Sequence, residues 1–155
     1  MIILSGYQED AIKWMKVIEE LNGGGMLADE MGLGKTHTMI GLIRQDQENT
    51  VATLILVPPV SMQQWIDSIM QQSHTQAWVI SQSTKCKTPP GTVYVVATTS
   101  ILNYNTKSSG LSIILATKWK RLIIDEGHII KDGKSLANET ASKIKATHKW
   151  IVTGE

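Results

Sequence analysis

The fold of this chain is decided by a glycine-rich stretch near its start, Gly23-Gly24-Gly25-Met26-Leu27-Ala28-Asp29-Glu30-Met31-Gly32-Leu33-Gly34-Lys35-Thr36. Gly32 and Gly34 can adopt backbone angles closed to other residues, so several N–H groups can turn inward around an anion. A helical pattern follows, and a helix N-terminus adds positive potential at the same place. The stretch therefore predicts a phosphate-binding loop. In such a loop Lys35 would reach the β- and γ-phosphates and the Thr36 hydroxyl would hold Mg²⁺.

This loop departs from the strict pattern G-x-x-x-x-G-K-[ST] at one position, because Asp29 stands where the pattern has glycine. The alternative interpretation is a glycine-rich turn that opens an ordinary helix. The other motifs of the chain favour the phosphate-binding loop.

Composition bounds the fold and the partners. With 155 residues, of which 42% are hydrophobic, the chain can bury one sizeable core, and we expect a single domain over residues 1–155. The net charge is +1, but residues 1–50 carry four Lys/Arg against eight Asp/Glu, whereas residues 118–155 carry eight against five. A nucleic-acid surface should therefore lie in the later two-thirds, although solvated helix faces would give the same pattern.

Cysteine usage and hydropathy indicate the environment. Cys86 is the only cysteine, so no internal disulfide can form, and no Cys/His cluster suggests zinc. We expect a reducing compartment. The start of the chain lacks the features of a signal peptide, and no apolar run approaches transmembrane length, so no membrane partner is expected.

Apolar runs alternate with helical patterns along the chain. Strands are expected at 26–28, 53–57, 77–80, 92–97, 121–125 and 150–152, and helices at 6–21, 36–44, 61–71, 111–116 and 135–145, with a short helix starting at 98–100. Helical spacing places Trp14, Leu21 and Trp65 toward the core, and Met26 is expected in a buried strand. Ser61 and Ser135 are expected to cap the helices that follow them. This alternation predicts an α/β fold with a mostly parallel central sheet and helices on both faces. Ligands bind such sheets at the carboxyl ends of the strands, and every polar motif of this chain falls there.

Asp125-Glu126-Gly127-His128 is the second strong motif, and it follows the apolar strand expected at 121–125. Phosphoryl transfer needs charge stabilisation and an oriented nucleophile. Asp125 is placed to bind Mg²⁺ through water, and Glu126 to orient or deprotonate the attacking water. A surface turn is the alternative for the two carboxylates. His128 is interpreted as a relay from the nucleotide to a nucleic-acid site, with a backbone-bonded loop histidine as its alternative.

Several motifs in this order resemble the first lobe of the Swi/Snf-type DNA-dependent ATPases, which belong to the superfamily 2 helicase-like proteins. They are Leu4-Ser5-Gly6-Tyr7-Gln8 with Trp14-Met15, Asp29–Thr36, Leu56-Val57-Pro58-Pro59-Val60-Ser61 with Trp65, Thr98-Thr99, Asp125–His128 with Ile130-Lys131, and Lys149–Gly154. Within that family, Asp-Glu-Gly-His and Lys149-Trp150 look most like the branch of helicase-like transcription factors and RING-ligase translocases. A viral global transactivator is a further resemblance.

The resemblance implies a RecA-like P-loop fold and accounts for Asp29, because the loops of this family carry that acidic residue. It also implies an ATP site with Gln8 at the adenine and catalysis by Lys35, Asp125 and Glu126, with Mg²⁺ held through Thr36 and Asp125. The nucleotide would be bound by Asp29, Met31, Gly32, Leu33, Gly34, Lys35, Thr36 and His37. DNA phosphates would meet Ser61, Thr98 and Thr99, and the lobes would be coupled through His128, Thr153 and Gly154.

The implied partners are double-stranded DNA, contacted along its backbone without base specificity, a second RecA-like lobe, and chromatin or transcription proteins. The implied location is the nucleus, or the host nucleus for a viral protein. Glu155 stands where the family has a second threonine, and the lobe that supplies arginines to the γ-phosphate is absent from the 155 residues. We therefore expect weak hydrolysis by this lobe alone. Two alternatives are a protein-interaction module without ATPase activity and a P-loop enzyme acting on small molecules.

Overall fold

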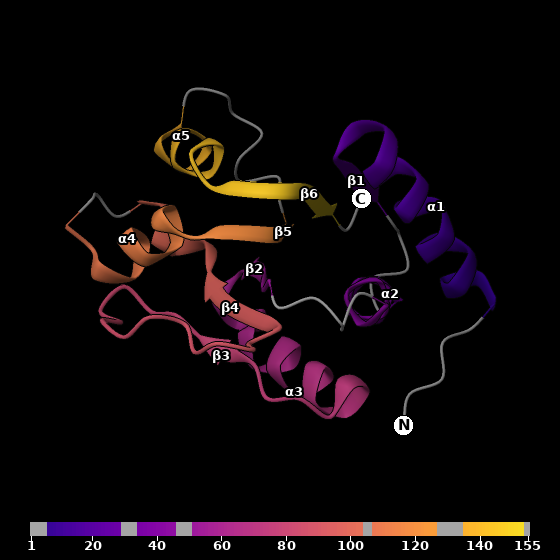
Figure 1. Cartoon of the computed structure of the whole chain (residues 1–155), viewed down its shortest axis with the longest axis horizontal. Helices are drawn as coiled ribbons and strands as arrows, with labels where there is room; N and C mark the ends of the chain where they lie inside the picture. Colours follow the sequence, from indigo (N-terminus) through magenta and orange to yellow (C-terminus); the bar gives the residue numbers. More distant parts are fainter. Residues whose placement is uncertain (1–5, 29–33, 46–50, 104–106, 127–134, 154–155) are drawn as a thin grey trace.

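The computed structural model describes residues 6–28, 34–45, 51–103, 107–126 and 135–153, with the backbone alone at 6–8 and 28. Its elements follow one another in alternation, as the sequence predicts (Figure 1). They are α1 (Gly6–Asn22), β1 (Gly24–Ala28), α2 (Gly34–Arg44), β2 (Thr53–Val57), the 3₁₀ turn η1 (Pro59–Ser61), α3 (Met62–Ser73), β3 (Trp78–Val79), β4 (Tyr94–Thr98), the 3₁₀ turn η2 (Thr99–Asn103), α4 (Ser109–Ala116), β5 (Lys118–Asp125), α5 (Leu136–Ser142) and β6 (Lys145–Thr153).

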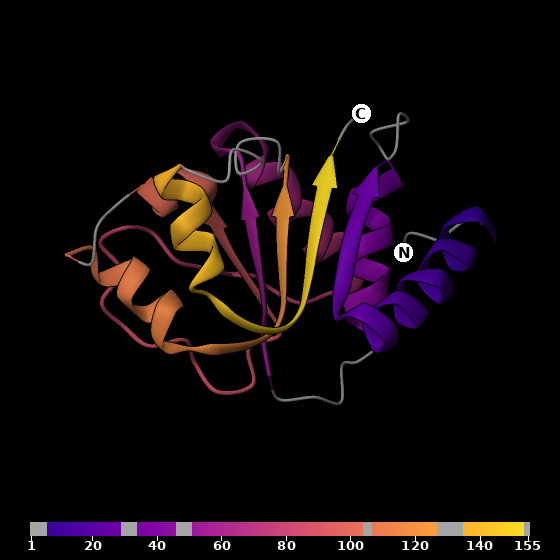
Figure 2. The same ribbon diagram turned by 90° about the horizontal axis from the view of Figure 1, so that it is seen from above.

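The strands form one six-stranded sheet in the order β1-β6-β5-β2-β4-β3, and every neighbouring pair is parallel. The arrowheads of β1, β6, β5 and β2 therefore emerge at the same edge of the sheet (Figure 2). The predicted parallel sheet is confirmed. Its order also brings β6, the last strand, between β1 and β5.

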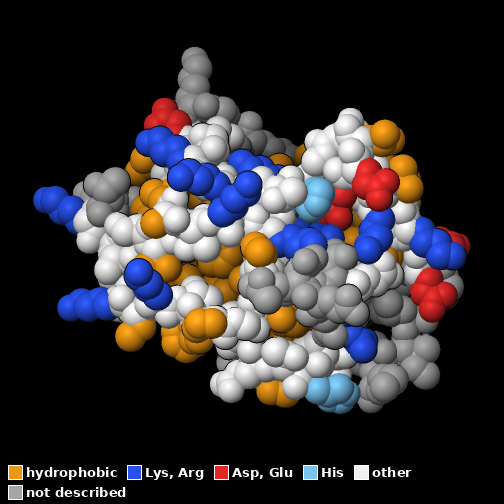
Figure 3. Space-filling view, in the orientation of Figure 1, with side chains coloured by type: hydrophobic (Ala, Val, Ile, Leu, Met, Phe, Trp, Pro, Cys, Tyr) orange, Lys and Arg blue, Asp and Glu red, His pale blue; other side chains and the backbone are white. Residues whose placement is uncertain are grey.

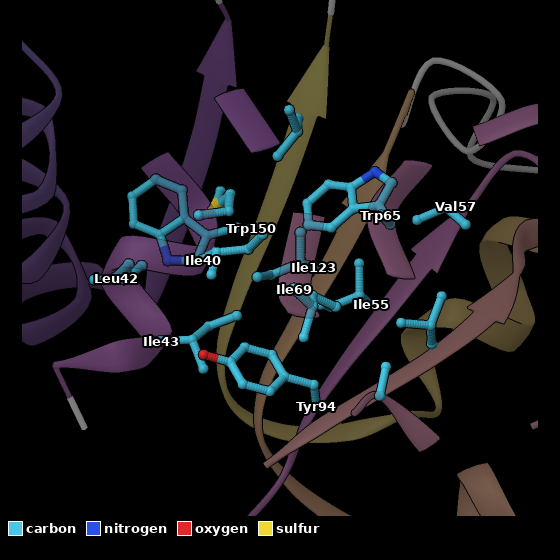
Figure 4. Packing of buried hydrophobic residues seen from close by; sticks show 14 of the residues in the cluster. Ile40, Leu42, Ile43, Ile55, Val57, Trp65, Ile69, Tyr94, Ile123 and Trp150 are labelled. Atoms are coloured by element: carbon cyan, nitrogen blue, oxygen red, sulfur yellow. The ribbon is translucent and has the colours of Figure 1, made fainter. Parts of the chain in front are cut away.

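Helices cover both faces of the sheet, which confirms the predicted layers. On one face α1, α2 and α3 pack over a core that includes Ile55, Ile123 and Trp150 (Figure 4). On the other face η2, α4 and α5 enclose a second core that includes Leu54, Trp119 and Leu122. All five residues of β2 are buried, as a strand covered on both faces requires.

One glycine of the opening stretch is required by packing. Gly24 has φ +145°, and a Cβ at this position would lie 1.8 Å from the carbonyl oxygen of Lys149 on β6. Any side chain there would push β1 away from β6. The Gly23–Gly25 run therefore both ends α1 and lets β1 approach its neighbour.

Several expectations at element ends were wrong. The last helix ends at Ser142 and the last strand begins at Lys145, because residues 145–149 pair with β5 with alternating exposure. Ser61 precedes α3 but makes no side-chain cap hydrogen bond, whereas Ser108 and Ser135 cap α4 and α5.

Three apolar side chains expected to be buried are exposed. Trp14 is 48% exposed and leans against Trp150, with 6.1 Å between ring centroids. Leu21 is 73% exposed, and Met26 on the edge strand β1 is 47% exposed. Helical spacing puts Trp14 and Leu21 on the same side of α1, and the described elements cover Trp14 only in part and Leu21 still less. Among the described residues, no helix is both long and apolar enough to cross a bilayer.

Candidate functional site

The carboxyl edge of the sheet collects the predicted site residues in an order set by the strands. Lys35 is the second residue of α2, which follows β1, Thr153 ends β6, and Asp125 ends β5. Ser61 follows β2 and Thr98 ends β4. Since the order is β1-β6-β5-β2-β4, the residues predicted for nucleotide lie on one side of this edge and those predicted for DNA on the other.

Lys35 is buried at 5% exposure, and its Nζ donates to the main-chain oxygen of Thr153 at 2.5 Å. Asp125 is paired with Val152, the residue before Thr153, in the parallel register of β5 and β6. The ammonium of Lys35 and the carboxylate of Asp125 therefore lie at adjacent strand ends, and the charge of Lys35 acts on the pKa of Asp125. The two strongest motifs of the sequence converge at one place.

The Asp125 carboxylate is half-buried and held from the side of α3. Trp65 Nε1 donates to Asp125 Oδ2 at 2.8 Å. Burial raises the pKa of Asp125 above its ordinary value, and the nearby charge of Glu126 adds to this increase. The Trp65 N–H, a backbone hydrogen bond from Glu126 and the charge of Lys35 oppose it without reversing it.

Glu126 has φ +54°, in the left-handed region that a non-glycine side chain rarely adopts. This conformation costs on the order of 1–3 kcal/mol and persists only where surrounding structure imposes it. Glu126 directly follows Asp125, the last residue of β5. The predicted catalytic carboxylate thus sits on strained backbone at the strand end, where functional residues are often found.

His37, predicted to bind nucleotide, is bonded to α3. Its Nδ1 lies 3.0 Å from Gln72 Oε1, and Gln72 Nε2 donates to the His37 carbonyl at 2.9 Å. Gln72 is fully buried, so it is part of the packing between α2 and α3. A contact between His37 and nucleotide stays a prediction.

The donor set at this edge fits magnesium. Mg²⁺ in phosphoryl-transfer sites is bound through one or two protein oxygens, with phosphate and water oxygens completing the shell. Asp125 offers a carboxylate, and Thr36 offers a hydroxyl beside Lys35 at the start of α2. No cluster of three or more His, Cys, Asp or Glu occurs within the described part of the chain.

The predicted DNA-contacting residues lie together at the ends of β2 and β4, whose last residues Val57 and Thr98 are paired. Thr98 and Met62, the residue after Ser61, line one depression of about 320 Å³. The Thr98 hydroxyl lies 2.7 Å from that of Ser100. Thr99 is 5% exposed, so it offers little surface to DNA, and a contact between Thr99 and DNA stays a prediction.

Positive charge gathers on another part of the surface. Lys and Arg side chains cluster over α5 and β6 in Figure 3, and Lys143, Lys145 and Lys149 are exposed. These residues belong to the basic last third of the sequence. Lys143 precedes β6 and Lys145 begins it, so these two lie toward the end of that strand opposite Thr153, whereas Lys149 lies in the middle of the strand.

Six predicted site residues lie outside the described residues: Asp29, Met31, Gly32, Leu33, His128 and Gly154. Gln8 is placed in α1 by its backbone alone. The sequence did not predict the hydrogen bonds of Trp65 and Gln72. Trp65 was interpreted as a core residue, and Gln72 was given no role. An indole or amide among apolar residues carries no sign in the sequence of which polar group it will meet.

The SNF2-related domain family matches residues 7–155 of this chain. The chain is 31% identical over 156 residues to an uncharacterized ATP-dependent helicase of Mycoplasma genitalium, covering 97% of this chain and 15% of that protein. It is 29% identical to a probable global transactivator of Orgyia pseudotsugata multicapsid polyhedrosis virus, covering 96% of this chain and 31% of that protein. Its fold resembles the SWI2/SNF2 ATPase core of Sulfolobus solfataricus solved in complex with double-stranded DNA, with TM-score 0.86 and 24% identity, over 99% of this chain and 32% of that one. The chain thus spans less than a third of the length of these relatives.

Proposed function

Because this chain belongs to the SNF2-related domain family, we propose that it is the ATP-binding lobe of a DNA-dependent ATPase that moves along double-stranded DNA. The observation that supports this most is that Lys35 and Asp125 meet at adjacent strand ends: Lys35 is bonded to the Thr153 carbonyl at the end of β6, and Asp125 ends the neighbouring strand β5. A cation and a carboxylate at neighbouring strand ends suit a triphosphate bound with magnesium.

Each side chain has a role in this proposal. Lys35 leaves the Thr153 carbonyl and binds the β- and γ-phosphates, and the Thr36 hydroxyl and Asp125 hold the metal. Glu126 orients or deprotonates the attacking water. Mg²⁺, when bound, neutralises negative charge on the phosphate oxygens.

The proposal extends to partners. Ser61 and Thr98 would contact DNA phosphates through hydroxyl groups, and Thr99 through its backbone, which positions DNA without reading its sequence. A second RecA-like lobe would supply arginines to the γ-phosphate, a contribution on the order of 10³–10⁵ in rate where it has been measured. Thr153 would couple the lobes. A human relative at 27% identity carries a name that includes regulator of chromatin, which supports a nuclear role in chromatin or transcription.

The experiment measures binding of Mg²⁺·ATP to the chain and its Lys35→Ala variant by titration calorimetry. We expect Lys35→Ala to weaken binding about 10- to 100-fold, because hydrogen bonds to charged groups contribute about 1.5–3 kcal/mol. Lys143→Ala, which removes an exposed lysine beyond α5, is the matched control and should bind like the wild type. Equal binding by Lys35→Ala and the wild type would remove the site assignment.

Hydrolysis tests the need for a second lobe. The 155 residues alone should turn over ATP poorly, with or without DNA, whereas a protein that also carries a second RecA-like lobe should show DNA-stimulated turnover. Robust DNA-stimulated turnover by this lobe alone would show that the second lobe is not required.

A further inference from the structure

Trp65 belongs to α3, and its indole nitrogen is hydrogen-bonded to Asp125 at the end of β5. The side chain is 1% exposed, and Nε1 donates to Asp125 Oδ2 at 2.8 Å across 60 residues of sequence. We propose that Trp65 is a positioning residue that fixes the orientation of the Asp125 carboxylate for magnesium. This inference rests on the proposed function, since it assigns Asp125 to the metal.

An indole is suited to this task because it can donate one hydrogen bond and accept none. It can hold a carboxylate oxygen, but it cannot compete with the carboxylate for a cation. Figure 4 shows the Trp65 ring in the buried cluster, with its nitrogen on the side away from Ile69 and Ile123. The packed ring therefore presents its N–H in a fixed direction.

Asp125 needs such support because of its place in the chain. It is the last residue of β5, and the next residue, Glu126, has a left-handed backbone conformation with φ +54°. A carboxylate at a strand end can rotate about its side-chain bonds, and the Trp65 N–H selects one orientation by holding Oδ2. In metal sites, partners of this kind that orient a ligand typically change metal affinity 10- to 100-fold when mutated.

The helix that carries Trp65, α3, also contacts α2, the helix that carries Lys35. Two turns beyond Trp65, Gln72 is bonded to both the ring and the carbonyl of His37 on α2. α3 is therefore attached by buried polar side chains to the helix that carries Lys35 and to the strand that carries Asp125. In both contacts α3 presents a polar atom to an element of the proposed site, β5 or α2. A helix used only for packing would present apolar atoms there.

The competing explanation is that Trp65 only fills the core. The chain offers a matched control, because Trp119 is also fully buried and its Nε1 donates to the Ile114 carbonyl at 3.1 Å, in the core on the opposite face of the sheet. Trp65→Phe and Trp119→Phe each remove one buried indole and one hydrogen bond. They differ in whether the bond ends on Asp125.

The experiment measures the Mg²⁺ concentration that gives half-maximal binding of a fluorescent ADP, together with ADP binding in EDTA. We expect Trp65→Phe to raise the half-saturating Mg²⁺ about 10-fold or more. In EDTA, Trp65→Phe should bind ADP as well as Trp119→Phe does. Trp119→Phe should need the same Mg²⁺ concentration as the wild type. Equal Mg²⁺ requirements for the two variants would overturn the proposal. Absence of nucleotide binding by the wild type would instead overturn the proposed function.

A measurement on the wild type covers the case in which Trp65→Phe does not fold. In protein labelled with ¹⁵N-tryptophan, the Trp65 indole N–H resonance should move when Mg²⁺ is added to the ADP complex, because the charge on Asp125 is then shared with the metal. The Trp119 resonance should stay in place. An unmoved Trp65 resonance would overturn the proposal.

Discussion

Replacing Glu19 with glutamine should destabilise this domain more than most single substitutions. Glu19 lies on α1 and is 5% exposed, and Arg121 on β5 is 2% exposed. Arg121 donates from Nε to Glu19 Oε2 at 2.7 Å and from Nη2 to Oε1 at 2.9 Å. Trp150 Nε1 donates to the same Oε2 at 2.9 Å. One carboxylate thus receives three N–H groups from two strands of the sheet.

The magnitude follows from what glutamine cannot do. Its amide keeps one oxygen and places an NH₂ group against a donor, so the Arg121 charge loses its counterion in a buried site. Removing one partner of a buried ion pair costs about 3–5 kcal/mol. Domains of this kind are stable by about 5–15 kcal/mol, so the variant should lose a large share of its free energy of unfolding.

The assay is urea unfolding followed by circular dichroism at neutral pH. A loss of about 4 kcal/mol lowers the midpoint by roughly 2 M urea, given a typical dependence of about 2 kcal/mol per M. Glu20→Gln is the matched control, because Glu20 is the next residue on α1 and is exposed, and it should change stability by less than about 0.5 kcal/mol.

A double variant separates the ion pair from packing. Glu19→Met with Arg121→Met replaces both partners by apolar side chains, so it should be more stable than Glu19→Gln, since no buried charge is left without its counterion. The reasoning would be refuted if Glu19→Gln stayed within about 1 kcal/mol of the wild type, or if the double variant were the less stable of the two.

Acid should reduce the difference between the wild type and Glu19→Gln. Burial raises the pKa of Glu19, but the hydrogen bonds and charge of Arg121, the Trp150 N–H and the charge of His148 together outweigh it, so the pKa lies below its ordinary value. The stability that ionised Glu19 contributes is therefore complete above the ordinary glutamate pKa of about 4.3 and lost as pH falls through the lower folded value. The raised pKa of Asp125 acts in the opposite direction but is common to both proteins, so it cancels in their difference. Urea midpoints at several pH values should show the two curves approaching one another only below about pH 4, and a gap that already closed at pH 6 would contradict this. At the start of α4, Gly110→Ala would place a Cβ 1.8 Å from the Ser81 carbonyl oxygen, whereas in the loop before β4 Gly91→Ala meets nothing within 4 Å and carries only the strain of φ +82°. Gly91→Ala should lower the free energy of unfolding in urea by about 1–2 kcal/mol and Gly110→Ala by clearly more. The reverse order would contradict the close contact between the start of α4 and the Ser81 carbonyl.

Local patterns in the sequence predicted the elements well where burial is uniform. The apolar runs 54–57 and 122–124 lie in β2 and β5, because a strand covered on both faces carries apolar residues at successive positions. The same rule failed at residues 145–149, where exposed and partly buried residues alternate: the prediction ended the helix at residue 145, left 146–149 unassigned and began the strand only at 150. A half-exposed strand beside a helix end has no distinctive local signal.

Tertiary structure decided where amphipathic side chains lie. Helical spacing predicted Trp14 for the core, and the structure leaves it half-exposed against Trp150. Spacing shows that residues share a face of a helix, but it does not show how wide a stripe the neighbouring elements cover. That width depends on where α1 sits over β1 and β6.

Hydrophobic periodicity and glycine-rich loops act over a few residues, so the sequence alone was enough to predict the α/β class, the parallel sheet and the edge at which Lys35 and Asp125 lie. The contacts between distant residues appear only in the folded chain: Lys35 donates to the Thr153 carbonyl, Trp65 holds Asp125, and Glu19 receives Arg121 and Trp150 from 102 and 131 residues away. Hydrophobic burial is non-directional and leaves its pattern in the chain. A hydrogen bond needs one particular atom at one distance, and strand order and register alone determine which atom that is.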